Sequence, residues 1–498
     1  MSNSEENKKP GISRRQFMFT SAAAAAGLTI LPGGIISAKG RIAPSDKLNI
    51  AGIGIGGMGF ANLKNLESQN IVGLCDVDWG YSQRVFEYFP NAAKYKDFRK
   101  MYDEMGKSID AVVVATADHT HALAASLAMA MSKHAFVQKP LTHSVYESRL
   151  LTKLTEKYKL ATQMGNQGSS GEGVRLVCEW IWNGEIGEVT KVEAFTDRPI
   201  WPQGLNRPSE VMQVPETLDW DLFIGPAPVR PYNPIYTPWN WRGWWDFGTG
   251  ALGDMACHIL HPVFVGLKLN YPTKVQGSST LLLTDCAPNA QMVKLNFPQR
   301  PKHKDVKINL KEVEVIWYDG GIKPNMPDGW PAGKNMNDAG GGVIFHGTKD
   351  KLICGCYGVN PWLLSGRVPD LPKTLRRVEL SHELDWVRAC KESPENRIET
   401  ASPFRVAGPF NEMVVMGVMA VRLQALNKEL IWDSEKMEFN NISDSEEIKT
   451  CIEDKFTIHD GHPTFNKKWT DPVNAKQYSK ELVKHNYRDG WALANMPA

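Results

Sequence analysis

A glycine pattern at residues 54–59 can hold a phosphate group. Gly54, Gly56 and Gly59 form the sequence Gly-x-Gly-x-x-Gly after a short apolar stretch and before residues with helical spacing. Such a turn lets backbone N–H groups and a helix N-terminus approach a pyrophosphate. The next apolar stretch ends in Asp76, whose carboxylate can accept hydrogen bonds from ribose hydroxyls and would repel a 2′-phosphate. The pattern predicts a dinucleotide site that prefers NAD to NADP.

Asp254, His258 and Lys139 are the groups best suited to acid–base chemistry. A spacing of four residues puts Asp254 and His258 on one helical face, where a carboxylate can orient an imidazole. Removing a hydride from an alcohol carbon requires a base for the hydroxyl proton, and an imidazole can act as that base. Lys139 follows an apolar stretch and can stabilise negative charge on the same oxygen. Taken alone, an Asp and a His at this spacing are more often a surface pair or a helix-end contact.

The elements around these groups alternate between strand and helix. Apolar strands are predicted at 48–53, 71–75, 109–116, 135–137 and 161–164, with helices between several of them and residues 117–121 as a loop. This order specifies a parallel, doubly wound Rossmann sheet. Ligands of such sheets lie beyond the carboxyl ends of the strands. The side chains expected there are those of Asp76, Thr116, His121, Lys139 and Asn166.

Over residues 46–435 the chain resembles the Gfo/Idh/MocA family (glucose-fructose oxidoreductase, inositol 2-dehydrogenase, rhizopine catabolism). The resemblance rests on five motifs, which are Gly54-x-Gly56-x-x-Gly59, Thr116…His119-x-His121, Lys139-Pro140, Gly184-x-Ile186-Gly187 and Asp254-Met255-Ala256-Cys257-His258. It implies catalytic roles for Lys139, Asp254 and His258. It also implies a cofactor site made of Gly54, Gly56, Gly57, Met58, Gly59, Asp76, Thr116, His121, Gln138, Lys139 and Asn166.

Two positions depart from the family pattern. The family usually has Glu-Lys-Pro where this chain has Gln138-Lys139-Pro140, and Thr-Pro where it has Thr116-Ala117. Replacing Glu by Gln removes a negative charge beside Lys139, which leaves open whether turnover is ordinary reversible dehydrogenation. His121 is expected to fix the loop over the cofactor rather than to react.

Aromatic residues collect between about residues 195 and 250, just before the Asp254 segment. An indole offers a flat apolar face to a sugar ring, and packing at the domain interface is the alternative. We expect a substrate wall formed by Trp201, Arg242, Trp244 and Trp245.

Four regions divide the chain. They are a signal segment at 1–40, a Rossmann domain at 46–166, a substrate-binding α/β domain at 167–440 and a polar extension at 441–498. Strand-like segments after residue 271 predict a large, mostly antiparallel sheet in the third region, and helical patterns at 380–392 and 404–427 are expected to pack back on the domains. The extension is expected only to wrap the surface. Such sheets join subunits in similar proteins, so we expect a homo-oligomer, either a dimer or a tetramer.

The N-terminus resembles a twin-arginine export signal. Arg14-Arg15-Gln16-Phe17 precedes a weak apolar run interrupted by Gly and Pro, which suits a cleaved signal better than a membrane helix. We therefore expect an exported, periplasmic protein without a membrane span, or a membrane-associated one if the signal is not cleaved. Export in the folded state lets a tightly bound cofactor travel inside the protein.

Composition narrows the class of partner. The 498 residues carry 57 Lys and Arg against 55 Asp and Glu, which gives no basic surplus for nucleic acid. The eight cysteines lack the paired spacing of a structural zinc site, so no metal is expected. A sugar or glycoside is the expected small-molecule partner.

Three hypotheses follow. The first is an NAD-dependent oxidoreductase acting on the CH–OH or keto group of a sugar, glycoside or polyol. The second is an NAD-dependent glycosidase, in which transient oxidation at C3 permits elimination of the aglycone and net redox is zero. The third is a non-catalytic sugar-binding protein, which the presence of Lys139, Asp254 and His258 argues against.

Overall fold

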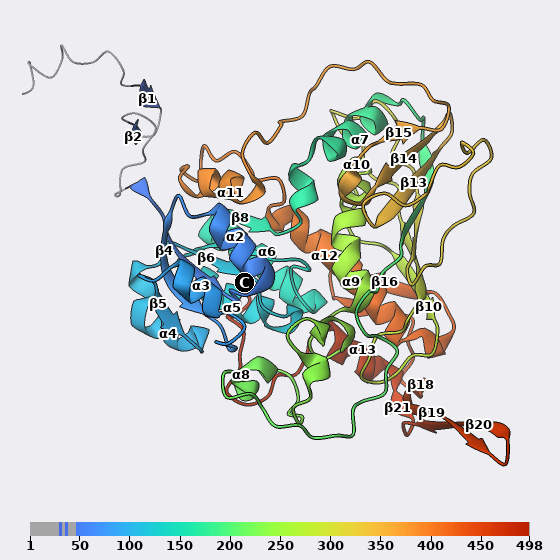
Figure 1. Ribbon diagram of the computed structural model, residues 1–498. Coiled ribbons are helices and arrows are strands. Elements are labelled where there is room, and N and C mark those ends of the chain that lie inside the picture. The colour runs from blue at the N-terminus through green and yellow to red at the C-terminus, as the bar shows by residue number, and fades with distance from the viewer. Residues whose placement is uncertain (1–28, 32–34, 38–45, 498) are drawn as a thin grey trace, which may run out of the picture.

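The computed structural model describes residues 29–31, 35–37 and 46–497 (Figure 1). The arginine pair predicted as an export signal lies outside the described residues. Two short strands, β1 (Thr29–Leu31) and β2 (Ile35–Ser37), pair with each other in the first region.

The first domain is a six-stranded parallel sheet with the order β5-β4-β3-β6-β7-β8. The strands are β3 (Asn49–Ile53), β4 (Asn70–Cys75), β5 (Ala93–Tyr95), β6 (Ala111–Val114), β7 (His134–Val137) and β8 (Thr162–Met164). The helices are α2 (Gly57–Asn65), α3 (Gln83–Tyr88), α4 (Phe98–Met105), α5 (Asp118–Ala130) and α6 (Val145–Tyr158). Numbered from β3, the strand order is 3-2-1-4-5-6, which confirms the predicted Rossmann architecture.

One local prediction in this domain is wrong. Residues 117–121 were expected to form a loop, but α5 begins at Asp118, so His119 and His121 lie in its first turn. Asp118 accepts hydrogen bonds from the backbone N–H and the hydroxyl of Thr249, and the His119 N–H donates to the Phe247 carbonyl. Tertiary contacts therefore bury a polar sequence that is typical of a loop.

The second domain is a nine-stranded, mostly antiparallel sheet with the order β15-β14-β13-β9-β12-β11-β10-β16-β17. Its strands are β9 (Val189–Thr196), β10 (Lys274–Ser279), β11 (Gln291–Phe297), β12 (Val313–Tyr318), β13 (Gly341–Gly347), β14 (Lys351–Gly355), β15 (Trp362–Leu363), β16 (Leu430–Asp433) and β17 (Glu438–Phe439). Only β9 and β12 run parallel among these pairs. Alternate residues of β11 are buried, as expected for a strand with one face on a core.

Helices join the two sheets. They are α7 (Glu172–Asn183), α8 (Trp220–Ile224), α9 (Gly250–Ile259), α10 (His261–Gly266), α11 (His382–Cys390) and α12 (Phe404–Arg422). Among the described residues only α12 is long and apolar enough to cross a membrane, and most of it is buried in the core between α6, α9 and the second sheet.

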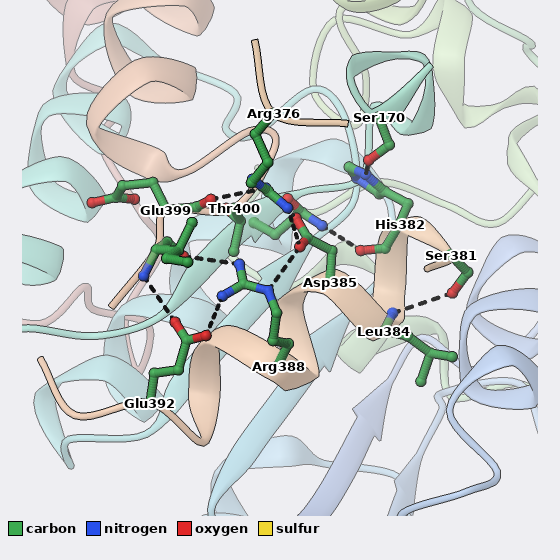
Figure 2. Close-up of polar contacts among 12 residues, drawn as sticks. Ser170, Arg376, Ser381, His382, Leu384, Asp385, Arg388, Glu392, Glu399 and Thr400 are labelled. Carbon is green, nitrogen blue, oxygen red and sulfur yellow. Dashed lines mark hydrogen bonds and ion pairs between the residues drawn. The ribbon is translucent and has the colours of Figure 1, made fainter. Parts of the chain in front are cut away.

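Helix α11 is fastened to the first domain by a polar network (Figure 2). His382 contacts the Ser170 hydroxyl at 2.7 Å through Nδ1 and the Met164 carbonyl oxygen at 2.8 Å through Nε2. Asp385 accepts from both Arg376 and Arg388. The His382 contacts fix the segment after β8, where the chain passes from one domain to the other, while the Asp385 ion pairs hold α11 to the residues just before it.

The C-terminal region contains β18 (Glu447–Ile448), β19 (Cys451–His459), β20 (His462–Trp469), β21 (Val473–Asn474) and α13 (Ala475–Val483). Strands β19 and β20 form a hairpin that projects from the body of the molecule (Figure 1). After α13 the chain returns to the Rossmann domain, where the C-terminus lies (Figure 1). The prediction of surface wrapping was therefore incomplete.

Candidate active site

A cavity of about 290 Å³ lies beyond the carboxyl ends of the Rossmann strands and reaches α9 of the second domain. Eleven of the residues predicted for the cofactor, the reaction or the substrate line it. They are Gly54, Gly56, Gly57, Met58, Asp76, Thr116, Gln138, Lys139, Arg242, Asp254 and His258. The cavity thus brings together the glycine turn and the three predicted reactive groups.

The glycine turn connects β3 to α2. Gly54 has a φ of +73°, in the left-handed region that suits glycine. A Cβ on Gly59 would overlap the Gly54 carbonyl oxygen, so Gly59 permits close packing of helix and strand and does not line the cavity. The N–H groups of Gly57 and Met58 begin α2 and have no acceptor one turn earlier within the helix, so they can bind an anion, whereas the Gly59 N–H donates to the Gly56 carbonyl. The ring of Tyr81, 41% exposed, lies over Gly56 and must turn aside before a pyrophosphate can reach that backbone.

Asp76 lies at the end of β4, as predicted for a ribose partner. Its Oδ2 accepts from the N–H groups of Ile55 and Gly56 and from the Ser82 hydroxyl, and its Oδ1 accepts from the Asp78 N–H. Burial raises the pKa of Asp76, while the hydrogen bonds from Asp78 and Ser82 act to lower it. Because Oδ1 has one protein partner, it retains capacity to accept a ribose hydroxyl.

Lys139, Arg242 and Asp254 form a buried ionic cluster. The Lys139 ammonium donates to Asp254 Oδ1 at 2.7 Å, and the Arg242 Nε donates to the same oxygen at 3.1 Å. Burial alone would raise the pKa of Asp254, but the charges of Lys139 and Arg242 hold it below its usual value. Burial raises the pKa of the neighbouring Asp118 to about 7, so this second carboxyl offsets the two cations only in part, and the remaining positive charge favours an oxygen that becomes negative.

His258 is on α9, one turn after Asp254. Burial, together with the charge of Lys139, lowers the pKa of His258 to about 3, so its imidazole is neutral at pH 7. The ring packs edge-on against Tyr357 with centroids 4.7 Å apart. The neutral imidazole has a lone pair free for a proton, but a pKa this low makes it a weak base, so a bound substrate must raise the pKa before His258 can act as one.

Besides Gly59, two predicted cofactor residues lie outside the cavity lining. His121 is buried, with Nδ1 2.8 Å from the Pro140 carbonyl oxygen and Nε2 3.1 Å from that of Thr116, so it braces the backbone at the ends of β6 and β7. Asn166 is also buried, and its amide donates to the Cys257 carbonyl at 3.4 Å. The prediction that these side chains contact the cofactor is not supported by their positions.

The predicted substrate wall is wrong in three of its four residues. Trp201, Trp244 and Trp245 are buried and line no part of this cavity, since they pack in the second domain. Trp239 and Trp241 line it instead and hold the Arg242 guanidinium 3.7 and 4.2 Å from their ring centroids. Sequence alone could not tell which indoles of this aromatic segment are buried, because the segment has no helical or strand period.

Two segments from outside the Rossmann domain cover the Asp76 end of the cavity. In the first, Leu218 pairs with Asp78, and the Asp219 N–H donates to the Val77 carbonyl. In the second, Trp491 of the C-terminal region lines the cavity beside Phe98. Trp491 was not predicted to line the cavity, because no local pattern in the sequence links residue 491 to the first domain.

Contacts fasten the tail that carries Trp491. The Arg99 guanidinium stacks 3.9 Å from the Trp491 ring centroid and donates to the Gly490 carbonyl. Arg488 donates to the Asp221 carboxylate at 2.6 Å, and the Ala494 N–H donates to the Ser126 hydroxyl. The tail, defined as residues 485–497, is therefore part of the wall of the cavity.

Comparison with known families supports both domains. Residues 48–166 match an oxidoreductase family model described as an NAD-binding Rossmann fold, and residues 182–299 match the C-terminal alpha/beta domain of an oxidoreductase family. The described residues contain no group of three or more His, Cys, Asp or Glu arranged to bind a metal.

Curated relatives match part of the chain. A glycosyl hydrolase family 109 protein of Shewanella sp. strain ANA-3 is 30% identical over 169 residues, 32% of this chain and 37% of the relative. An alpha-N-acetylgalactosaminidase of Shewanella oneidensis is 27% identical over 208 residues, 37% of this chain and 45% of the relative. The chain thus spans less than half the length of these relatives.

Solved structures share the fold. The WlbA dehydrogenase from Chromobactrium violaceum, in complex with NADH and UDP-GlcNAcA, has a TM-score of 0.53 at 14% identity, covering 81% of this chain and 99% of that one. GenD2 from gentamicin A biosynthesis, in complex with NAD, has a TM-score of 0.52 at 15% identity, covering 82% of this chain and 100% of that one. At these identities the likeness concerns the fold alone.

Proposed function

The chain belongs to the Gfo/Idh/MocA oxidoreductase family, and on this basis we propose that it is an NAD-dependent oxidoreductase acting on a ring hydroxyl or keto group of a sugar, glycoside or polyol. One observation carries the proposal. Lys139, Asp254 and His258 line the same cavity as the glycine turn, so a group bound at one end can meet reactive side chains at the other.

NAD, when bound, would supply the hydride acceptor for the alcohol carbon. The N-terminus of α2 would hold its pyrophosphate, and Asp76 would hold the adenosine ribose. The residues fit this cofactor because the cavity runs from the glycine turn to Lys139 and its lining includes the Asp76 carboxylate. That carboxylate favours NAD over NADP.

The reactive residues have distinct tasks. Neutral His258 takes the hydroxyl proton as the alcohol is oxidised. Lys139 stabilises the negative charge that develops on the oxygen. Asp254 keeps the ammonium in place, because its Oδ1 accepts from Lys139 and from Arg242. The Arg242 guanidinium is fixed in turn between Trp239 and Trp241, which form an apolar wall for the sugar.

Tight retention of the cofactor is part of the proposal. The segment around Leu218 and the tail with Trp491 both cover the Asp76 end of the cavity. A dinucleotide seated there would leave only after one of them moves. Retention suits the export that the twin arginines predict, since the cofactor would then leave the cytoplasm inside the protein.

A redox-neutral glycosidase is the second candidate. The enclosed Asp76 end and the names of the curated relatives favour it. In that reaction the sugar loses a hydride at C3 and its hydroxyl proton to become a ketone, which makes the C2 proton acidic. Loss of that proton expels the aglycone, water adds, and the ketone is reduced by the same hydride. The cofactor is regenerated in each cycle, so it need not exchange.

One experiment separates the candidates. The purified protein is mixed with sugars and p-nitrophenyl glycosides, including the α-N-acetylgalactosaminide, while nicotinamide absorbance and nitrophenol release are recorded together. With NAD added, a change at 340 nm without release supports the oxidoreductase, and the change is sustained if the bound cofactor exchanges or stoichiometric with the protein if it does not. Release without net change supports the glycosidase. Absence of both signals with protein that contains NAD would overturn both candidates.

A further inference from the structure

A tyrosine with a strained backbone faces His258 in the cavity. Tyr357 lies in the short turn η7 (Cys356–Gly358) between β14 and β15, with φ +64° and ψ 8°. Left-handed backbone is unfavourable for a bulky side chain, and residues held in it collect at functional sites. The residues around Tyr357 must therefore hold this strained backbone in place.

Two glycines, Gly168 and Gly173, leave room for this turn, and we call them the glycine cradle. A Cβ on Gly168 would lie 2.6 Å from the Tyr357 Cβ, and a Cβ on Gly173 would overlap the Gly358 carbonyl oxygen. The cradle is held in place by the contact of Ser170 with His382 on α11 (Figure 2). The glycine cradle and the turn η7, which are far apart in the sequence, therefore pack closely, and Tyr357 lies beside His258.

The hydroxyl of Tyr357 is uncommitted. Tyr357 lines the cavity, and its hydroxyl has no hydrogen-bond partner among the described residues. The charged groups nearby are already paired, since Asp254 accepts from both Lys139 and Arg242. Tyr357 is therefore free to meet a neutral sugar at this end of the cavity, as are His258 and Gln167, which also line it.

We propose that Tyr357 is a substrate-binding residue whose hydroxyl hydrogen-bonds to a second oxygen of the sugar, and so determines which ring hydroxyl meets Lys139 and His258. The inference rests on the proposed function, because it places a sugar in this cavity. It assigns the backbone strain and the glycine cradle to substrate orientation.

The test compares Tyr357→Phe with wild type on N-acetyl-D-galactosamine and a set of its monodeoxy analogues. Binding is followed by tryptophan fluorescence and turnover by the assay above. We expect kcat/KM to fall about tenfold on the parent sugar, because one hydrogen bond is lost. On the analogue that lacks the contacted hydroxyl, the two proteins should behave alike. Tyr318→Phe is the matched control, because its hydroxyl faces Glu193 outside the cavity.

A second variant separates function from folding. Asn tolerates left-handed backbone, so Tyr357→Asn should keep its NAD and melt within a few degrees of wild type while losing sugar binding. Unchanged sugar binding and turnover in both variants would overturn the assignment alone, as would equal losses on every analogue. Failure of the wild type to bind or convert any sugar would overturn the proposed function and this inference with it.

Discussion

At the scale of single residues, the most informative position is Gln138, where the family usually has Glu. Its amide donates to Asn62 Oδ1 at 2.9 Å, while the Asn62 amide donates to Glu383 Oε1 at 2.8 Å. Because Glu383 takes the Asn62 amide, Asn62 presents only its oxygen to residue 138. A donor is needed there, which Gln supplies and an ionised Glu does not.

This chain of hydrogen bonds predicts the effect of restoring Glu. Gln138→Glu should lower the free energy of unfolding by about 2 kcal/mol, because it sets a buried carboxylate against a carbonyl oxygen. Adding Glu383→Gln should recover most of the loss, since Asn62 can then turn its amide toward Glu at 138. Chemical denaturation of the two variants and wild type measures the difference. Equal stability of the single and double variants would contradict the account.

Lys139 gives the second prediction at this scale. Lys139→Met keeps the length of the side chain but removes the ammonium that faces Asp254. We expect turnover to fall by about 10² to 10³, because the developing oxyanion loses its nearest cation. NAD content, read from absorbance at 260 nm after denaturation, should stay near that of wild type. Turnover within a few-fold of wild type would remove Lys139 from the mechanism.

At the scale of elements, the sequence predicted the strands and helices that build the site but not everything that covers it. The strands before Asp76 and Lys139 could be predicted, because an apolar run between a glycine turn and a helical pattern has few interpretations other than a buried strand. The sequence did not predict that Tyr357 and Trp491 line the cavity, because they belong to a turn and a tail that reach the site only in the folded protein. The indoles were misassigned for a similar reason, because burial of Trp244 depends on Tyr236 and Cys286.

The tail gives a prediction that belongs to this scale. A chain ending at Arg488, and Trp491→Ala in the full chain, should lose NAD during dialysis about tenfold faster than wild type, the order expected from losing one aromatic contact. Bound NAD is measured by absorbance at 260 nm and by enzymatic assay of the extract. Trp469→Ala is the matched control, because Trp469 is half exposed on β20 and does not line the cavity. Equal NAD loss from all four proteins would contradict retention by the tail.

At the scale of the whole molecule, buried histidines dominate the response to acid. Burial lowers the pKa of eight of the twelve histidines. They are His119, His121, His134, His143, His258, His261, His382 and His485. Against them, burial raises the pKa of only three carboxyls to about 7, those of Asp118, Glu147 and Asp319.

The sign follows from the protons bound in each state. Between about pH 4 and 6.5 the unfolded chain carries protons on histidines that the native state keeps neutral, so stability should rise as pH increases. These three carboxyls, together with Asp76 and Glu412, whose pKa is also raised by burial, act in the opposite direction but are fewer than the histidines. Each neutral histidine costs about 2 kcal/mol at pH 5 and about 0.2 kcal/mol at pH 7, for an unfolded pKa near 6.5. Calorimetry should show a melting temperature that rises steeply from pH 5 to 7.

His261 isolates one of these contributions. Neither ring nitrogen of His261 has a hydrogen-bond partner among the described residues, and the ring packs on Phe410. His261→Leu should therefore stabilise the protein more at pH 5 than at pH 7, whereas His459→Leu on the exposed hairpin should not. A gain independent of pH would show that His261 does not contribute to the acid response.

The position of Trp491 has a consequence for how the molecule is made. Residue 491 is synthesised after both domains, yet it lines the cavity formed by the first domain. The nucleotide pocket therefore stays open at one end until both domains have emerged, and its wall is completed only when the tail follows them. Cofactor capture is then a late event of maturation, which must wait for a stretch of chain made hundreds of residues after the glycine turn.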